Sequence, residues 1–371
     1  MKHKVLVTGG AGFIGSFLVD KLVEQGHDVR ILDNFEPQVH QKGAPGYLNK
    51  EAELIKGDMR DIEDLKKAIS DVEVIFHQAA MVGVGQSMYQ IQKYVDVNSF
   101  GTAKLLDLLA NSENNVKKII VASSMSTYGE GSYKCEKCGE VNPPLRSEEQ
   151  MKKGDWEVRC SKCNSILKPI PTKETKKQDL NSIYALTKKE QEDMCLIFGK
   201  SYGIPIISLR YFNVFGPRQS LSNPYTGVTA IFMSRIKNDN QPIIYEDGLQ
   251  TRDFISIHDI VDANILSMEK NSANYEILNV GTGKQITIKN IAEVLTKLYG
   301  KDIKPQITNK FRKGDIRHCF ADISKIKSKL GFEPRISFEE GMKELIEWSK
   351  GVEAEDKFEE AASELKEKGL L

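Results

Sequence analysis

Residues 8–15 read Thr8-Gly9-Gly10-Ala11-Gly12-Phe13-Ile14-Gly15, between an apolar segment and a helical one. In this context Gly9 can form a tight turn, Gly12 can let the backbone approach a phosphate group, and Gly15 can allow the helix to pack closely on the strand. The first gap between glycines is one residue wider than in Gly-x-Gly-x-x-Gly. The stretch predicts a strand, a turn and a helix whose N-terminus binds a dinucleotide.

An acidic residue follows the glycine stretch at a distance suitable for binding a ribose of the dinucleotide. Asp33 ends the next apolar segment, 18 residues after Gly15. A carboxylate there accepts hydrogen bonds from ribose hydroxyls and repels a 2′-phosphate, so the pattern favours NAD over NADP. Asp58 is a second candidate, for holding the adenine. The alternative role for such a residue, capping a helix, suits Asp61 better.

Short apolar segments alternate with helical ones through the first third of the chain. The segments are Lys4–Thr8, Phe13–Glu24, Asp28–Asp33, Glu53–Gly57, Ile62–Ile69, Val74–His77, Val95–Ala110 and Lys118–Ser123. This alternation predicts an α/β fold, with a doubly wound parallel sheet covered by helices on both faces. Beyond residue 215 the pattern loosens, and helices are expected near 226–238, 287–299, 322–330 and 338–350.

These patterns divide the chain into four parts. Residues 1–130 and 170–215 are expected to form the dinucleotide-binding core, and residues 131–169 an insertion. Residues 216–350 are expected to form mainly a smaller α/β lobe for the substrate. Residues 351–371 are highly charged and predict a solvated helix or tail, to which we assign no function.

The overall composition excludes several classes of partner. The 371 residues contain 52 Lys and Arg and 52 Asp and Glu, so the net charge is zero and no global field attracts nucleic acid or an acidic membrane. The N-terminal region lacks the pattern of a signal peptide, and no apolar run reaches about 18 residues. We therefore expect a cytoplasmic protein.

Four cysteines form two Cys-x-x-Cys pairs, Cys135 with Cys138 and Cys160 with Cys163, separated by 21 residues. This spacing is typical of a zinc ribbon. Four thiolates predict a closed structural zinc site without catalytic water. Free thiols or a redox disulfide are the alternatives.

Tyr184 and Lys188 lie four residues apart in a helical segment, Asn181–Lys200, and so share one helix face. A nearby cation favours the phenolate form of a tyrosine. Alone, such a pair is typical of an exposed helix surface. Together with the glycine stretch, it indicates a catalytic acid and base.

At this point the chain resembles the extended short-chain dehydrogenase/reductase family, and specifically its nucleotide-sugar epimerases, from about residue 4 to residue 350. The motifs that carry the resemblance are Thr8–Gly15, Asp33, Gly57-Asp58, His77-Gln78-Ala79-Ala80, Asn98, Ser123-Ser124, Tyr184 with Lys188, Arg210–Arg218 and Arg252-Asp253-Phe254-Ile255.

The resemblance implies a Rossmann-type core and a role for each matching residue. Ser124 would bind the reacting sugar hydroxyl, Tyr184 would be the acid and base, and Lys188 would hold the nicotinamide ribose. The residues implied to bind NAD are Gly9, Gly12, Phe13, Ile14, Gly15, Asp33, Asn34, Asp58, Met59, Ala79, Ala80, Asn98, Tyr184 and Lys188. Those implied to contact the nucleotide sugar are Ser124, Ser126, Asn213, Arg252, Arg312, Asp315 and Cys319.

The expectation for Cys319 has an alternative, and the resemblance has one further implication. Cys319 can equally be a small buried structural residue. Relatives pair two long helices from each subunit, so the resemblance also implies a homodimer.

The residues after Ser124 indicate which of the reactions found in the resembled family this chain catalyses. They are Met125 and Ser126, whereas the similar sugar 4,6-dehydratases place an Asp-Glu pair there to eliminate water. Oxidation and reduction at one carbon remain, and epimerisation at the fourth sugar carbon is the simplest reaction of that kind. NAD would then stay bound and not be consumed.

The cysteines lie within the 59 residues that separate Ser124 from Tyr184, a longer stretch than in most relatives. The insertion is expected over or beside the substrate cleft, as a lid or wall. It resembles that of dTDP-L-rhamnose 4-epimerases, as does the loop Ser222–Val228. This predicts interconversion of dTDP-L-rhamnose and dTDP-6-deoxy-L-talose, with UDP-glucose or UDP-N-acetylglucosamine as the alternative substrates. A non-catalytic NAD-sensing module that binds through its zinc ribbon is a further alternative.

Overall fold

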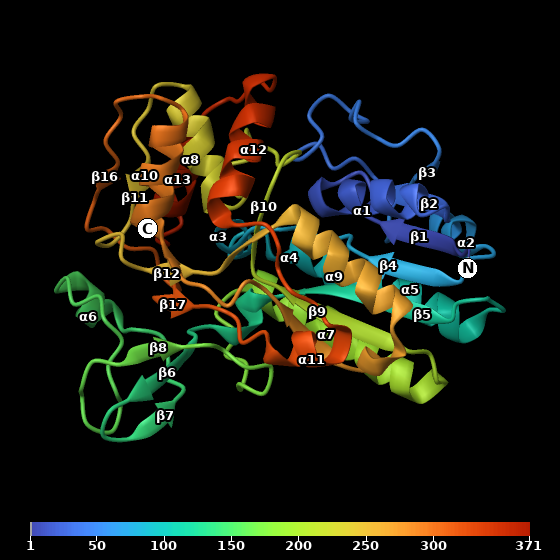
Figure 1. The fold of residues 1–371 in the computed structure, drawn as a ribbon, viewed down its shortest axis with the longest axis horizontal. Coiled ribbons are helices and arrows are strands. Elements are labelled where there is room, and N and C mark those ends of the chain that lie inside the picture. The colour runs from blue at the N-terminus through green and yellow to red at the C-terminus, as the bar shows by residue number, and fades with distance from the viewer. Residues whose placement is uncertain (1) are drawn as a thin grey trace.

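The computed structural model describes residues 2–371 and contains a central seven-stranded sheet (Figure 1). The strand order is β14-β9-β5-β4-β1-β2-β3, and every neighbouring pair is parallel. The strands are β1 Lys4–Thr8, β2 Asp28–Asp33, β3 Glu53–Lys56, β4 Val74–His77, β5 Lys118–Ser124, β9 Ile206–Tyr211 and β14 Ile277–Val280. The order reverses between β1 and β4, and in such sheets the carboxyl ends of the strands open a ligand crevice at that point.

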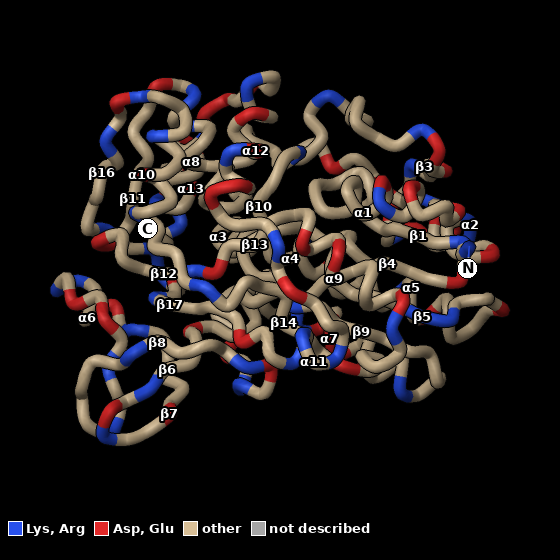
Figure 2. The backbone as a smooth tube through the Cα atoms, viewed as in Figure 1, with Lys and Arg blue, Asp and Glu red and all other residues tan. Residues whose placement is uncertain are grey.

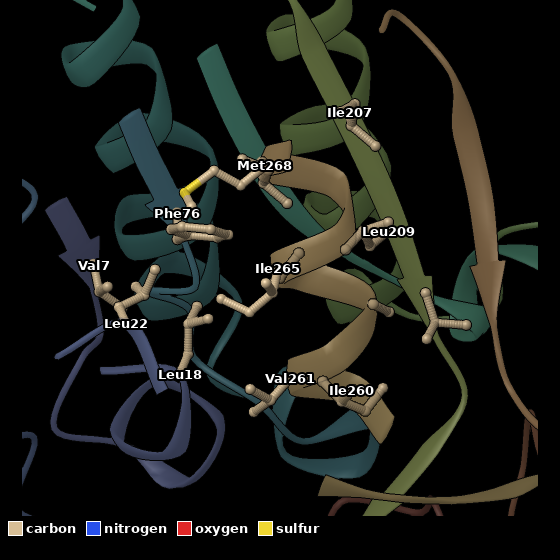
Figure 3. Close-up of a cluster of buried hydrophobic side chains, with 14 of the residues drawn as sticks. Val7, Leu18, Leu22, Phe76, Ile207, Leu209, Ile260, Val261, Ile265 and Met268 are labelled. Atoms are coloured by element: carbon tan, nitrogen blue, oxygen red, sulfur yellow. The ribbon is translucent and has the colours of Figure 1, made fainter. Parts of the chain in front are cut away.

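Helices cover both faces of the sheet, which confirms the predicted doubly wound core. On one face lie α1 Phe13–Glu24, α9 Ile257–Glu269 and α11 Ser324–Leu330. Figure 3 shows apolar side chains of α1 and α9 in one buried cluster with Val7, Phe76 and Leu209 of the sheet. On the other face lie α2 Ile62–Ile69, α5 Gly101–Asn111 and α7 Ile183–Tyr202. Burial of apolar surface on both faces explains why the strands are almost continuously apolar.

The helix expected at 95–110 is irregular at its start. Two short helices, α3 Val84–Ser87 and α4 Ile91–Tyr94, lead into a π-helical segment, η1 Val95–Phe100, which continues directly as α5. Isolated π-helical turns are often found at functional sites.

The second half of the chain contributes to both lobes. Its smaller lobe holds the paired strands β10 Asn213–Phe215 and β13 Phe254–Ser256, β11 Ile243–Ile244 and β16 Gln306–Ile307, and β12 Thr251–Arg252 between β15 Ile286–Thr287 and β17 His318–Cys319. The helices α8 Val228–Lys237, α10 Ile288–Leu298 and α12 Phe338–Lys350 pack around a separate apolar cluster. In contrast, β14, α9 and α11 belong to the core, because their apolar residues extend and cover the central sheet.

The insertion folds as a small unit below the second lobe in Figure 1. Its strands β6 Ser132–Cys135, β7 Gly139–Val141 and β8 Lys168–Ile170 form an antiparallel sheet, and α6 Glu148–Lys152 lies between β7 and β8 in the chain. The unit has its own buried cluster around Tyr133, Val158 and Leu167. Figure 2 shows residues of both charge signs interspersed along it.

The chain ends in α13 Phe358–Glu367, and the short 3-10 helices are η2 Met125–Tyr128 and η3 Asn271–Ala273. Among residues 2–371, no helix combines the length and the hydropathy needed to cross a membrane.

Candidate active site

A cavity of about 640 Å³ lies at the carboxyl edge of the central sheet, between the two lobes. The ends of β1, β2, β4 and β5 form one side, and residues of the second lobe form the other. The structure brings together nearly all the residues that the sequence singled out. Every predicted cofactor and substrate residue lines this cavity except Asn98 and Cys319.

The glycine stretch forms the turn that the sequence predicts. Gly9 has a φ of 67°, a conformation that side chains disfavour. A Cβ atom on Gly15 would lie 2.2 Å from the carbonyl oxygen of Gly9, so only glycine fits there. Gly12 caps α1 without any side-chain hydrogen bond. The first backbone N–H groups of α1 are therefore available to an anion such as a pyrophosphate.

Acidic residues lie at the end of β2 and in the loop after β3. The carboxylate of Asp33 accepts hydrogen bonds from the backbone N–H of Ala11, at 3.0 Å, and of Phe35, at 2.9 Å. These bonds fix the carboxylate beside the glycine turn. The Asp58 carboxylate accepts from Asn34 at 2.9 Å, and its hydrogen bonds with Arg60 hold its pKa well below the usual range. Both carboxylates line the cavity, where they can meet ribose or adenine groups.

The three candidate catalytic side chains come from two adjacent elements. Ser124 ends β5, while Tyr184 and Lys188 lie one turn apart near the start of α7. The Tyr184 backbone N–H donates to Ser87 Oγ at 3.0 Å, and its ring packs edge-on against Tyr94 with centroids 6.4 Å apart. Burial raises the pKa of Tyr184, and the Ser124 hydroxyl opposes that rise.

Lys188 is held by a buried polar network. Its Nζ donates to Gln191 Oε1 at 2.8 Å, and burial lowers its pKa to about 8. Gln191 also contacts His77 and Thr102. Burial lowers the pKa of His77 to about 3, so its ring is neutral and serves to connect β4 with α5 and α7. Sequence reasoning missed Ser87 and Gln191, because a lone polar residue in a helix gives no signal of its partner.

Asn98 and Cys319 lie behind the cavity wall, contrary to the expectation from the resemblance. The Asn98 amide pairs with the backbone of Met81 and donates to Thr187, so the π-helical turn positions the loop after β4. Cys319 is 1% exposed and contacts Thr172, and burial raises its pKa to about 12. This placement agrees with the structural alternative for Cys319.

The wall on the second lobe carries two arginines. Arg252 donates to the backbone carbonyls of Arg317, at 3.0 Å, and Ile316, at 2.7 Å, which holds its guanidinium in place. Arg312 pairs with Asp315 at 2.9 Å. The side-chain oxygens of Asn213 and Ser126 are buried without a hydrogen-bond partner among the described residues. A polar ligand in the cavity would satisfy them.

The segment that closes the cavity is not the insertion. None of residues 131–169 lines it, so the expectation that the insertion forms a lid or wall is wrong for this structure. The C-terminal segment, to which we assigned no function, contributes Phe358, Ala361, Ala362 and Leu365. Their apolar i, i+3, i+4, i+7 spacing is visible in the sequence, although the surrounding charge hides it.

The insertion instead docks on the second lobe through buried ion pairs. Both terminal nitrogens of Arg146 donate to the carboxylate of Glu246, at 2.8 and 2.9 Å. Arg317, whose side chain is fully buried, pairs with Glu157 of the insertion and with Glu246 and Asp247. The insertion is thus fixed to the segment that carries Arg312 and Asp315.

The four cysteines of the insertion converge. Their sulfur atoms all lie within 4.8 Å of one another, and Cys135 Sγ is 3.5 Å from Cys163 Sγ. Sulfur atoms around one tetrahedral zinc ion lie about 3.8 Å apart, so the donor set fits such an ion. The hydroxyl and backbone N–H of Ser165 lower the pKa of Cys163 to about 6, which favours a thiolate at neutral pH.

Two family models match most of the chain. The NAD dependent epimerase/dehydratase family matches residues 5–149, and GDP-mannose 4,6 dehydratase matches residues 166–345. The dTDP-L-rhamnose 4-epimerase of Burkholderia thailandensis is 34% identical over 349 residues, which are 93% of this chain and 94% of that protein.

Solved structures of sugar epimerases resemble this chain at sequence identities close to that of the Burkholderia enzyme. The UDP-N-acetylglucosamine 4-epimerase of Methanobrevibacter ruminantium, in complex with UDP-N-acetylmuramic acid, is 36% identical with a TM-score of 0.76, over 94% of this chain and 98% of that one. The UDP-glucuronic acid 4-epimerase of Bacillus cereus, in complex with UDP-glucuronic acid and NAD, is 30% identical with a TM-score of 0.75, over 94% and 99%.

Proposed function

Because this chain belongs to the extended short-chain dehydrogenase/reductase family, among its NAD-dependent sugar epimerases, we propose that it is a nucleotide-sugar 4-epimerase that keeps NAD bound. One observation carries the proposal. Ser124, Tyr184 and Lys188 line the same cavity as the glycine turn and Asp33. This supports a proposed acid and base beside a proposed dinucleotide site. The residues after Ser124, Met125 and Ser126, provide no acidic pair for dehydration.

The geometry assigns a task to each group. The N-terminus of α1 and Asp33 would hold the pyrophosphate and a ribose of NAD. When bound, NAD supplies a nicotinamide that accepts a hydride from the sugar and later returns it. Ser124 would orient the C4 hydroxyl, and Tyr184 would take its proton and give it back after the 4-keto sugar has turned over. The Lys188 cation, held by Gln191, would stabilise the phenolate.

We propose dTDP-L-rhamnose as the substrate, converted reversibly to dTDP-6-deoxy-L-talose. The support is the similarity to the Burkholderia enzyme over 93% of the chain, together with the resemblance of the insertion. UDP-glucose and UDP-N-acetylglucosamine are the second candidates, because a UDP-N-acetylglucosamine 4-epimerase is equally similar.

The substrate is tested with purified protein to which no NAD is added. dTDP-L-rhamnose, UDP-glucose and UDP-N-acetylglucosamine are offered separately, and the configuration at C4 of each product is read by NMR. We expect dTDP-L-rhamnose to form its C4 epimer without added cofactor. Inertness toward all three sugars would reject the substrates proposed here.

We further propose that the cysteine cluster binds one structural zinc ion. The support is the convergence of four sulfur atoms and the docking of the unit away from the cavity. The hydrogen bond with Cys163 raises the pKa of Cys138 to about 12, so without a cation Cys138 would keep its proton. A zinc ion would replace that proton and fix the short strands of the insertion.

Metal analysis tests the zinc proposal. We expect about one zinc per chain in the purified protein and none in a Cys135→Ser/Cys163→Ser variant, which should also unfold at a lower temperature. A Cys195→Ala variant serves as the control, because this cysteine lies in the core, and its zinc content should not change. Absence of stoichiometric zinc in the unmodified protein would contradict the proposal.

We also propose that the protein is a homodimer. Helices α5 and α7 lie side by side, and α7 and the adjoining η1 expose large apolar side chains to solvent. Ile197 is 66% exposed, Tyr202 57% and Phe100 50%. An apolar face of this kind is typical of a surface that pairs with another subunit. A monomeric mass in analytical ultracentrifugation would contradict this proposal.

A further inference from the structure

Helix α13 presents one face to the cavity and the other to solvent. Phe358, Ala361, Ala362 and Leu365 line the cavity, and their spacing places them on a single helical stripe. The charged residues between them are exposed. The matched family regions end at residue 345, before α13 begins.

Contacts with both lobes hold α13 across the cavity. At its start, Arg235 of α8 stacks on the Phe358 ring at 4.5 Å and pairs with Glu359 at 3.1 Å. Near its end, the Glu364 carboxylate accepts hydrogen bonds from the phenols of Tyr89 and Tyr225. These hydrogen bonds hold the pKa of Glu364 below its usual range. The helix is therefore a fixed part of the site and not a frayed tail.

The end of α13 lies close to the candidate catalytic residues. Leu365 packs against Gly85, where an added Cβ atom would lie 3.3 Å from the leucine. Two residues later, Ser87 accepts the hydrogen bond from the backbone of Tyr184. A sugar whose C4 hydroxyl meets Tyr184 would thus place part of its ring, or a substituent of it, toward this contact.

The loop opposite Leu365 carries no polar side chain. The loop opposite reads Val82-Gly83-Val84-Gly85, and α13 brings no cation to the cavity. Among the described residues that line it, the lysine and arginine side chains are Lys188, Arg252 and Arg312. Each is already engaged, with Gln191, with backbone carbonyls and with Asp315 respectively. A carboxylate or hydroxyl turned toward Leu365 would lose water without gaining a partner.

We propose that α13 is the wall that selects the sugar, with Leu365 as a specificity-determining residue that favours a methyl group at C5 over a hydroxymethyl or carboxylate group. This inference rests on the proposed epimerase function and deepens it. It assigns 6-deoxy sugars as the substrate class for a physical reason that is independent of the insertion.

Binding measurements can test this inference apart from turnover. Calorimetry compares dTDP-L-rhamnose with dTDP-L-mannose, which differs only by a hydroxyl at C6, in a Tyr184→Phe background where the reaction is slowed by about 10²–10⁴-fold. We expect the methyl sugar to bind about tenfold more tightly. This factor is at the low end of the discrimination that an apolar pocket achieves between ligands that differ by one small group. Adding Leu365→Ser should remove most of that preference, and adding Leu365→Met should retain it.

Lys366→Ala provides the matched control, because Lys366 is the next residue and lies on the exposed face. It should leave the preference unchanged. Equal binding of the two sugars before Leu365 is altered would overturn the inference, as would an unchanged preference in Leu365→Ser. Failure of the epimerase function itself is recognised separately, as absence of turnover in the protein with Tyr184 intact.

Discussion

Replacement of Tyr184 by phenylalanine is expected to lower kcat by about 10²–10⁴-fold, the range that a positioned acid and base contributes. The change removes only the phenol oxygen, and the ring can keep its edge-on contact with Tyr94. The bound NAD content should therefore stay the same. Initial rates of C4 epimerisation by NMR, together with NAD released on denaturation, measure the two effects.

Tyr202→Phe is the matched control, since Tyr202 ends the same helix and is 57% exposed. It should leave kcat unchanged. Full turnover in Tyr184→Phe would exclude this phenol as the acid and base. If that variant altered no sugar turnover while the protein bound nucleic acid, the NAD-sensing alternative would be favoured.

Replacement of Arg317 by methionine is expected to lower the free energy of unfolding by about 1–3 kcal/mol, the cost of leaving polar groups beside a buried position without their hydrogen-bond partner. The Arg317 side chain is fully buried, and its loss leaves Asp247 without its cation and Glu157 with His318 alone. Glu246 would keep Arg146. The midpoint of urea denaturation measures the effect.

Arg159→Met is the control for this prediction. Arg159 also pairs with an acidic residue of the insertion, Asp155 at 2.8 Å, but both side chains are about one third exposed. An exposed pair of this kind contributes at most about 1 kcal/mol. Equal midpoints for the two variants would mean that the buried network does not join the insertion to the second lobe.

Three features of the site were predictable because their signal is local. The glycine stretch needs only a strand before it and a helix after it, and Asp33 needs only the end of the next strand. Tyr184 and Lys188 share a face because of helix geometry alone. The signal of the two Cys-x-x-Cys pairs is also local, because it consists of the spacing within and between them, and their four sulfur atoms converge in the structure.

Other features depend on residues far apart in the chain. Arg146 meets Glu246 across 100 residues, and Tyr89 meets Glu364 across 275. Neither pair leaves a periodic pattern, so the docking of the insertion and the position of α13 were not predictable. The insertion was expected over the cavity because both of its ends lie near Ser124, but its ion pairs hold it on the second lobe.

The core sheet, the glycine turn, the placement of Tyr184 beside Lys188 and the cysteine cluster could all be predicted from the sequence, since each follows from spacing along one or two adjacent elements. Long-range packing, in contrast, sets which segment closes the cavity and places Asn98 and Cys319 behind its wall. The physical reason is that closure depends on which distant surfaces are complementary in shape and charge. Local propensity and periodicity carry no information about such pairs.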